Sequence, residues 1–172
     1  MNFETTQTVT ETHVQTNLRW DPGYIKSIPG ALKLGAGLLD LVCLICVLCA
    51  SPYWREQPVG EWYIFVCMTA FWVTIILLIM YLLHAIEKFH VIPWLMLEFG
   101  FYALWAFFYF TAAIATAVQG QHSAALAAAG FFGFAAMFVY GVDAFFKFRG
   151  WRAGQLAQGE RKVTRTTEST AP

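Results

Sequence analysis

The sequence predicts an all-α fold, an integral membrane four-helix bundle with disordered tails, from its apolar runs and its composition. Residues 62–83 contain no charged residue and no Pro, Gly, Asn or Gln. An apolar run of about 20 residues matches the roughly 30 Å hydrocarbon layer of a bilayer. The chain is 58% hydrophobic and 17% aromatic, which leaves too little polar surface to cover a water-soluble core. The competing interpretation of residues 62–83, a buried helix in a soluble protein, requires a much larger surrounding domain.

The two ends of the chain are polar and differ sharply from the rest. Residues 1–17 are rich in threonine and lack the apolar core of a signal peptide, so insertion is expected to begin with the first span. Residues 153–172 are similarly polar. Because neither tail can bury much apolar area, we expect both to be disordered. Residues 18–152 then form a single membrane domain.

A lead-in segment with turn and interface residues precedes the first span. Asp21–Gly23 reads Asp-Pro-Gly, which is typical of a turn, and aromatic residues on either side suit the membrane interface. Leu18, Tyr24 and Lys26 also fit a loose cholesterol-contact pattern. That pattern occurs often by chance, so it marks only a candidate interface segment.

Four apolar runs are each long enough to cross a bilayer. Pro29 and Gly30 end the lead-in, and Pro93 is well placed to begin the third helix. The connections between the runs are short, which predicts antiparallel neighbours. The predicted spans cover residues 32–50, 62–83, 94–118 and 124–148.

The distribution of positive charge predicts the orientation of the spans. Only Arg55 lies on the side of the two shorter turns. Both tails and the loop around Lys88 are therefore expected in the cytosol. The remaining positive residues gather on that other side: Arg19, Lys26, Lys33, Lys88, Lys147, Arg149, Arg152, Arg161, Lys162 and Arg165.

Ionisable residues near the cytosolic ends of the spans suggest a polar layer inside the bundle. Such residues are costly within a membrane and are functional candidates for that reason. Asp143 and Lys147 have the i, i+4 spacing that allows them to pair on one helix face. We expect the layer to hold the helices in register, with a structural or partner-binding role. Its predicted members are Lys33, His84, Glu98, Asp143 and Lys147.

Asp40 lies deeper, near the middle of the first span, and is the sixth member of this candidate site. We expect it to be protonated or to bond to Thr74 or Tyr109. A second function class remains open at this point: a small transporter or a proton- or cation-conducting protein that uses Asp40, Glu98 and Asp143. Mid-span Pro or Gly breaks, which many transporters use, are missing.

Other function classes find little support in the sequence. The formal net charge is zero, so there is no basic surface to predict a nucleic-acid partner. Cys43, Cys46, Cys49 and Cys67 lie within apolar runs, where a thiol packs as a small hydrophobe. We expect no catalytic site, no metal site and no cofactor.

Short motifs at defined places in this architecture carry a family resemblance. Val91–Trp94 opens the third span, and Tyr140–Phe146 near the end of the fourth precedes Trp151-Arg152. In this order they resemble the MARVEL-domain tetraspan proteins over about residues 18–152. The lead-in is most similar to the chemokine-like-factor group of that family, and Tyr140–Phe146 to the plasmolipin group.

The resemblance implies a non-enzymatic membrane organiser. It implies work in membrane trafficking, in membrane apposition and junctions, or in lipid microdomains, at the plasma membrane or endosomal and vesicular membranes. The implied partners are membrane lipids, with cholesterol a candidate, and other transmembrane proteins that the helices bind and stabilise. Small residues such as Ala129 and Gly133 allow close helix contacts within one chain, or alternatively between copies in a homo-oligomer.

Overall fold

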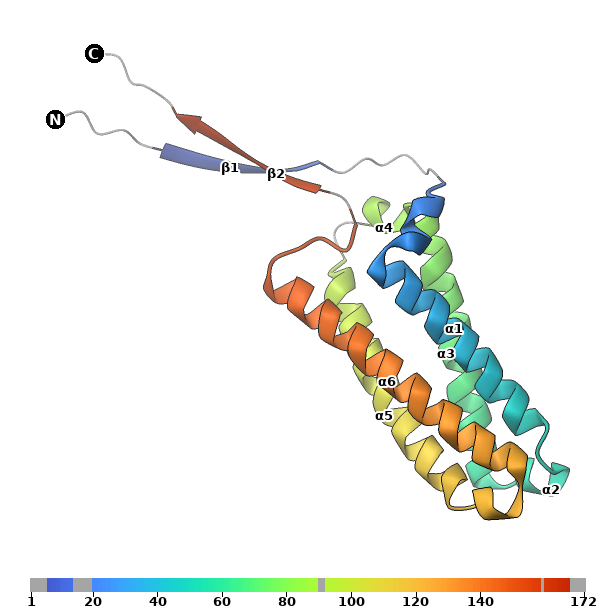
Figure 1. The fold of residues 1–172 in the computed structure, drawn as a ribbon. Coiled ribbons are helices and arrows are strands. Elements are labelled where there is room, and N and C mark those ends of the chain that lie inside the picture. The colour runs from blue at the N-terminus through green and yellow to red at the C-terminus, as the bar shows by residue number, and fades with distance from the viewer. Residues whose placement is uncertain (1–5, 14–19, 90–91, 159, 168–172) are drawn as a thin grey trace, which may run out of the picture.

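Four long helices form the body of the molecule in the computed structural model, which describes residues 6–13, 20–89, 92–158 and 160–167 (Figure 1). All four are long and apolar enough to cross a membrane. This agrees with the predicted all-α membrane bundle. The four helices are α1 (Ile28–Leu48), α3 (Pro58–Leu82), α5 (Trp94–Ala117) and α6 (Ala124–Arg152).

The helix boundaries differ from the predicted spans by up to four residues. Helix α1 begins at Ile28, because the Ser27 side chain accepts a hydrogen bond from Gly30 N and caps the first turn. Pro29 fits that first turn, where its missing N–H is not needed. Helix α6 continues to Arg152, which places Arg149 and Arg152 in its last turn, where positive charge complements the helix dipole.

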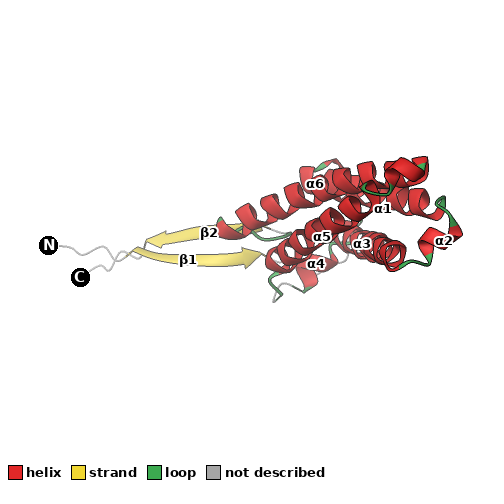
Figure 2. Cartoon of the chain, turned by 90° about the horizontal axis from the view of Figure 1, so that it is seen from below, coloured by secondary structure: helices red, strands yellow, loops and turns green. Residues whose placement is uncertain are grey.

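The helices form a ring in which each one contacts two neighbours. Helix α1 lies between α3 and α6, and α5 closes the ring on the opposite side (Figures 1 and 2). The closest pair is α5 and α6. A Cβ at Gly130 would lie 3.3 Å from the backbone of Ala117, and one at Gly133 would lie 3.0 Å from Ala113 Cβ. Small residues therefore set the distance between these two helices.

Short helical elements connect the long ones. At one end of the bundle, Trp54 Nε1 in the connection between α1 and α3 donates to Gln119 Oε1 in the connection between α5 and α6, at 2.5 Å. At the opposite end, Asp21 N donates to Leu82 O at 3.0 Å and so ties the lead-in to the end of α3. The short elements are η1 (Pro22–Lys26), α2 (Pro52–Arg55), α4 (Ala85–Lys88) and η2 (Gly120–His122).

The two tails pair with each other where the sequence analysis expects no regular structure. Strand β1 (Thr6–His13) runs antiparallel to β2 (Glu160–Thr167), with His13 opposite Glu160. Both segments are rich in threonine, and β-branched residues favour extended backbone. The pair projects from the end of the bundle that carries α4 (Figure 1). Residues 1–5, 14–17, 159 and 168–172 of the predicted tails lie outside the described residues.

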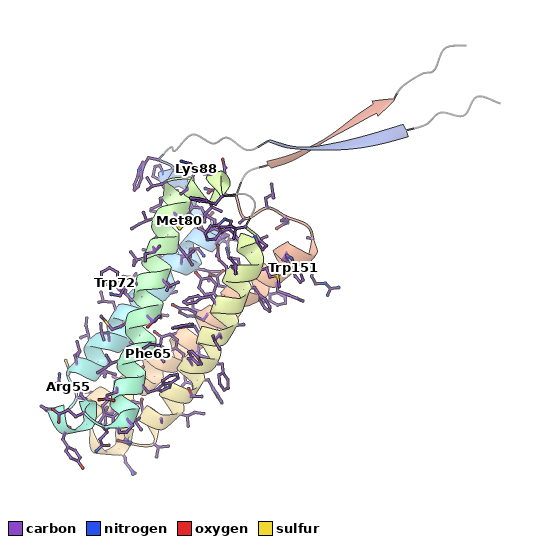
Figure 3. The ribbon with its side chains drawn as sticks, turned by 180° about the vertical axis from the view of Figure 1, so that it is seen from behind. Arg55, Phe65, Trp72, Met80, Lys88 and Trp151 are labelled. Carbon is purple, nitrogen blue, oxygen red and sulfur yellow. The ribbon has the colours of Figure 1, made fainter. Side chains whose placement is uncertain are left out.

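The outer faces of the long helices are apolar along their length. Trp72 is 55% exposed in the middle of α3, and Phe138 is 68% exposed in the middle of α6. Figure 3 shows Arg55 at one end of the bundle, with Lys88 and Trp151 at the other. The charged ends and the apolar belt between them match the two regions of a bilayer.

Candidate functional site

Glu98, in the second turn of α5, binds side chains from the three other long helices. Its Oε2 atom lies 2.6 Å from Lys33 Nζ of α1 and 2.8 Å from Lys147 Nζ of α6. Its Oε1 atom accepts a hydrogen bond from the Tyr81 hydroxyl of α3. The carboxylate of Glu98 on α5 therefore contacts a side chain from each of the three other long helices.

The two lysines of this cluster also contact tyrosine side chains. Lys33 Nζ donates a second hydrogen bond to Tyr102 OH at 2.9 Å and lies 4.7 Å from the centre of that ring. Both Lys33 and Lys147 lie 5.1 Å from the centre of the Tyr81 ring. These cation–π contacts are favourable because the ammonium groups are desolvated. Tyrosine hydroxyls and ring faces replace the water that the lysines lose.

Asp143 joins the cluster differently from the way the sequence predicts. Its expected partner, Lys147 at i+4, extends to Glu98 instead. Within the described residues the ion-pair partner of Asp143 is Lys33, whose Nζ lies 3.9 Å from Oδ2. That distance is too long for a hydrogen bond, and neither Asp143 oxygen accepts one from any described residue. The carboxylate is nevertheless buried, with 2% of its side chain exposed.

The cluster is balanced in formal charge. Lys33 and Lys147 contribute two positive charges, and Glu98 and Asp143 two negative charges. A buried ion pair is not itself strong evidence of stability, because desolvation offsets the attraction. Removal of one partner is costly, since it leaves an uncompensated charge away from water. That these four side chains hold the helices in register stays a prediction.

His84 lies outside this cluster, in a second polar group beyond the end of α3. Its Nε2 atom is 3.8 Å from Asp21 Oδ2 and 4.0 Å from Glu87 Oε1. The residue has a left-handed backbone (φ 53°) that turns the chain from α3 into α4. His84 thus connects the lead-in to the loop, and the predicted polar layer divides into two groups.

Asp40 forms a third polar group deeper in the bundle. Tyr109 OH donates to its Oδ1 at 2.6 Å, which is one of the alternatives expected from the sequence. Tyr140 OH donates to Oδ2 at 2.9 Å. The alternative partner, Thr74, instead forms a hydrogen bond with the Tyr140 hydroxyl at 2.9 Å, so its link to Asp40 runs through that tyrosine. The carboxyl group is therefore satisfied by tyrosines of α5 and α6.

The lead-in segment packs on the charged end of the bundle. The Tyr24 ring stacks on Tyr81 with their centroids 4.8 Å apart and their planes 8° from parallel. Burial raises the pKa of the Tyr24 hydroxyl well above its usual range, and Glu98 adds to the effect, so the phenol stays protonated. Lys26 is exposed, and Leu18 lies outside the described residues. The cholesterol-contact pattern of these three residues stays a prediction.

Sequence reasoning missed three tyrosines that complete these groups: Tyr81, Tyr102 and Tyr140. A signal was present, because a tyrosine hydroxyl inside an apolar span needs a polar partner. All three are 1% exposed or less. Their partners could not be assigned, because the direction of each side chain depends on how the helices pack.

The acids of the site are paired with groups of the same chain. Its acids face lysine ammonium groups or tyrosine hydroxyls, and the described residues contain no group of three His, Cys, Asp or Glu side chains that could hold a metal ion. The arrangement provides fixed charge inside a bundle of membrane helices.

Comparison with known proteins assigns the family. Residues 24–146 match the family MARVEL, described as a membrane-associating domain. The chain belongs to the MARVEL family. This confirms the resemblance inferred from the motifs. Of the described helices, the match spans α1, α3 and α5 whole and most of α6.

Plasmolipins are among the relatives of this MARVEL protein. Zebrafish (Danio rerio) plasmolipin is 35% identical over 143 residues, which cover 81% of this chain and 82% of the relative. Mouse plasmolipin is 34% identical over 78% of each chain. Mouse CKLF-like MARVEL transmembrane domain-containing protein 8 is 26% identical over 88% of this chain and 86% of its own. No solved structure gives a significant match.

Proposed function

We propose that this MARVEL protein is a non-enzymatic membrane organiser that binds lipids and other transmembrane proteins through its helix faces. In this proposal it acts in membrane trafficking, in membrane apposition or junctions, or in lipid microdomains, at the plasma membrane or endosomal and vesicular membranes. The observation that carries the proposal is that the charged side chains of the spans pair inside the bundle while its exterior is apolar. Membership of a membrane-associating family agrees with this role.

The interior supports the proposal because its charged side chains bind other side chains of the same chain. Glu98 contacts three helices, and Asp40 accepts hydrogen bonds from two tyrosines. Among the described residues, no hydrogen bond joins the side chains around Glu98 to the side chains around Asp40. A conducting protein would need polar groups that continue through the membrane.

The exterior supports it because large apolar and aromatic side chains face outward on every long helix. These side chains are available for lipid or for helices of other membrane proteins, since the bundle does not use them. Examples from the four helices are Leu38 (58% exposed), Trp72 (55%), Phe107 (59%) and Phe138 (68%).

The proposed orientation places both tails in the cytosol. It rests on the excess of positive residues at the bundle end that carries the tails, against Arg55 at the other end (Figure 3). The tails are then accessible to cytosolic proteins.

Co-purification from native membranes in a mild detergent tests the organiser function. The full chain is compared with a form that lacks residues 1–17 and 160–172. This form retains Gln158, whose Nε2 donates to Tyr81 O at 2.9 Å. Recovery of the same membrane-protein partners with both forms is the expected result. Absence of specific partners from both would contradict the proposal.

The conducting alternative is tested separately on the purified protein in vesicles. Asp40→Asn and Glu98→Gln remove the charge of each acid while nearly preserving its shape. We expect no proton or cation flux that depends on either acid. Flux through the wild-type protein that both variants abolish while they remain folded would favour the transporter over the organiser.

A further inference from the structure

A cavity of about 280 Å³ is lined mainly by residues of α1, α6 and the segment after α6, with single residues from η1, α3 and α5. Tyr24, Tyr81, Asp143 and Lys147 line one part of its wall. The volume is far larger than the roughly 10–15 Å³ that one water molecule needs. The space can therefore take a polar group of several atoms.

Asp143 places two carboxylate oxygens without hydrogen-bond donors at this cavity, as far as the described residues go. Its side chain is only 2% exposed, and its two oxygens accept no hydrogen bond within the described part of the chain. Lys33 Nζ is 3.9 Å away, and Lys147 is bound to Glu98. A buried carboxylate without donors is costly, so a ligand with several N–H groups would be favoured there.

Tyr24 supplies a second unpaired polar atom at the same cavity. Its hydroxyl is buried and forms no hydrogen bond with any described residue. The stacking of its ring on Tyr81 holds this hydroxyl in place. A phenol can donate or accept a hydrogen bond. Two unpaired groups from separate elements, η1 and α6, thus line one space.

Another part of the cavity wall is apolar and reaches the outer surface of the bundle. Ile28 and Leu32 of α1 and Phe146 of α6 line it. Ile28 is 67% exposed and Phe146 is 43% exposed. Because these residues belong to membrane spans, their exposed faces meet lipid. A ligand with a polar head and an apolar tail fits both parts of the wall.

We propose that this cavity binds an ethanolamine phospholipid, whose ammonium group donates hydrogen bonds to Asp143 while its acyl chains pass Ile28 and Phe146. An ammonium group has three N–H donors, whereas the trimethylammonium of choline has none. A zwitterionic head group also preserves the charge balance of the buried cluster. The proposal needs only the membrane location of the chain and does not depend on its partner proteins.

Native mass spectrometry of the purified full chain in detergent tests the proposal. Phosphatidylethanolamine and phosphatidylcholine with identical acyl chains are added at equal concentrations. We expect about a tenfold preference for the ethanolamine lipid, the size of one hydrogen bond to a charged group. Equal binding of the two lipids would overturn the proposal. Free ethanolamine at the same concentration should not bind detectably, and binding as tight as that of the lipid would overturn the assignment to a phospholipid.

Three variants locate the effect. Asp143→Asn removes the charge and one acceptor, and we expect the lipid preference to fall to near one. Tyr24→Phe preserves the ring stack but removes the hydroxyl oxygen, which can accept a second hydrogen bond from the ammonium group, and the preference should fall about threefold. Glu56→Gln, an exposed acid at the other end of the bundle, should leave it unchanged.

Tyr24→Phe keeps the test decisive where Asp143→Asn does not fold. An unchanged preference in Tyr24→Phe would then overturn the proposed site. Co-purification of partner proteins is a separate measurement, so a failure of the lipid site and a failure of the organiser function are distinguishable.

Discussion

At the scale of single residues, the molecule depends on a few polar side chains that lie far from water. Glu98 compensates two lysines at once, and Asp40 is held by two tyrosines. Neither acid has an equivalent partner within its own helix. The stability of the bundle should therefore respond strongly to small changes at these positions.

Glu98→Gln should strongly destabilise the bundle. The substitution removes the negative charge that Lys33 and Lys147 share and leaves both ammonium groups buried with a weaker partner. Loss of one member of a buried ionic group costs about 3–5 kcal/mol. Unfolding in detergent should detect this loss, while membrane insertion stays intact because the span remains apolar. Glu56→Gln is the control, and equal stability of the two variants would contradict the role of Glu98.

Tyr140→Phe should weaken the bundle without a change in its shape. The variant loses the hydroxyl that bonds to Asp40 Oδ2 and to Thr74. Leaving such buried groups unsatisfied costs about 1–3 kcal/mol. Tyr53→Phe is a matched control, because Tyr53 is 77% exposed. The same denaturation measurement on both variants should separate them, and no difference would show that the Asp40 group adds little.

At the scale of helices, the position of the small residues decides which contacts are close. Gly133 faces both α3 and α5, because an added Cβ would lie 2.8 Å from Tyr63 OH of α3 and 3.0 Å from Ala113 Cβ of α5. Gly141, two turns further along α6, has no atom within 4 Å of an added Cβ. The same residue type therefore has a packing role at one position and faces outward at the other.

Gly133→Val should disrupt the contact between α5 and α6. Its side chain overlaps Ala113 and the Tyr63 hydroxyl, which donates to Ala129 O. Overpacking of this kind costs about 1–3 kcal/mol. Gly141→Val introduces the same side chain into open space and should be close to neutral in thermal unfolding. A similar loss of stability in both variants would show that close packing at Gly133 is not responsible.

At the scale of the whole molecule, the uneven distribution of charge should set the orientation in the membrane. Both tails leave the bundle at the end that carries Lys88 and Trp151, opposite Arg55 (Figures 1 and 3). Because the number of spans is four, which is even, both tails must lie on the same side of the membrane.

Epitope tags at both ends should be reached by antibody only after the cells are permeabilised. A tag inserted at residues 51–60 should be reached in intact cells wherever the protein is at the plasma membrane. The reason is the excess of Lys and Arg near the tails, which is retained in the cytosol. Tails that are accessible in intact cells would reverse the proposed orientation.

The predicted spans and the family resemblance came from local features of the sequence. An apolar run such as residues 62–83 forms a helix in a bilayer regardless of its neighbours, because each backbone amide must pair within the helix. The four spans were therefore predictable, and their bounds differ by only a few residues. The candidate acids Asp40, Glu98 and Asp143 were also predictable, since charged residues stand out within apolar runs.

The partners of these acids were decided only by the tertiary structure. Spacing along one helix predicts that Lys147 pairs with Asp143, but Glu98 of α5 lies within 2.8 Å of Lys147 Nζ. Asp143 lies beside a cavity and accepts no hydrogen bond from any described residue, which no pattern in α6 reveals. The physical reason is that a buried charge takes the best partner among all the helices around it. That choice depends on how the helices pack, which a linear pattern does not contain.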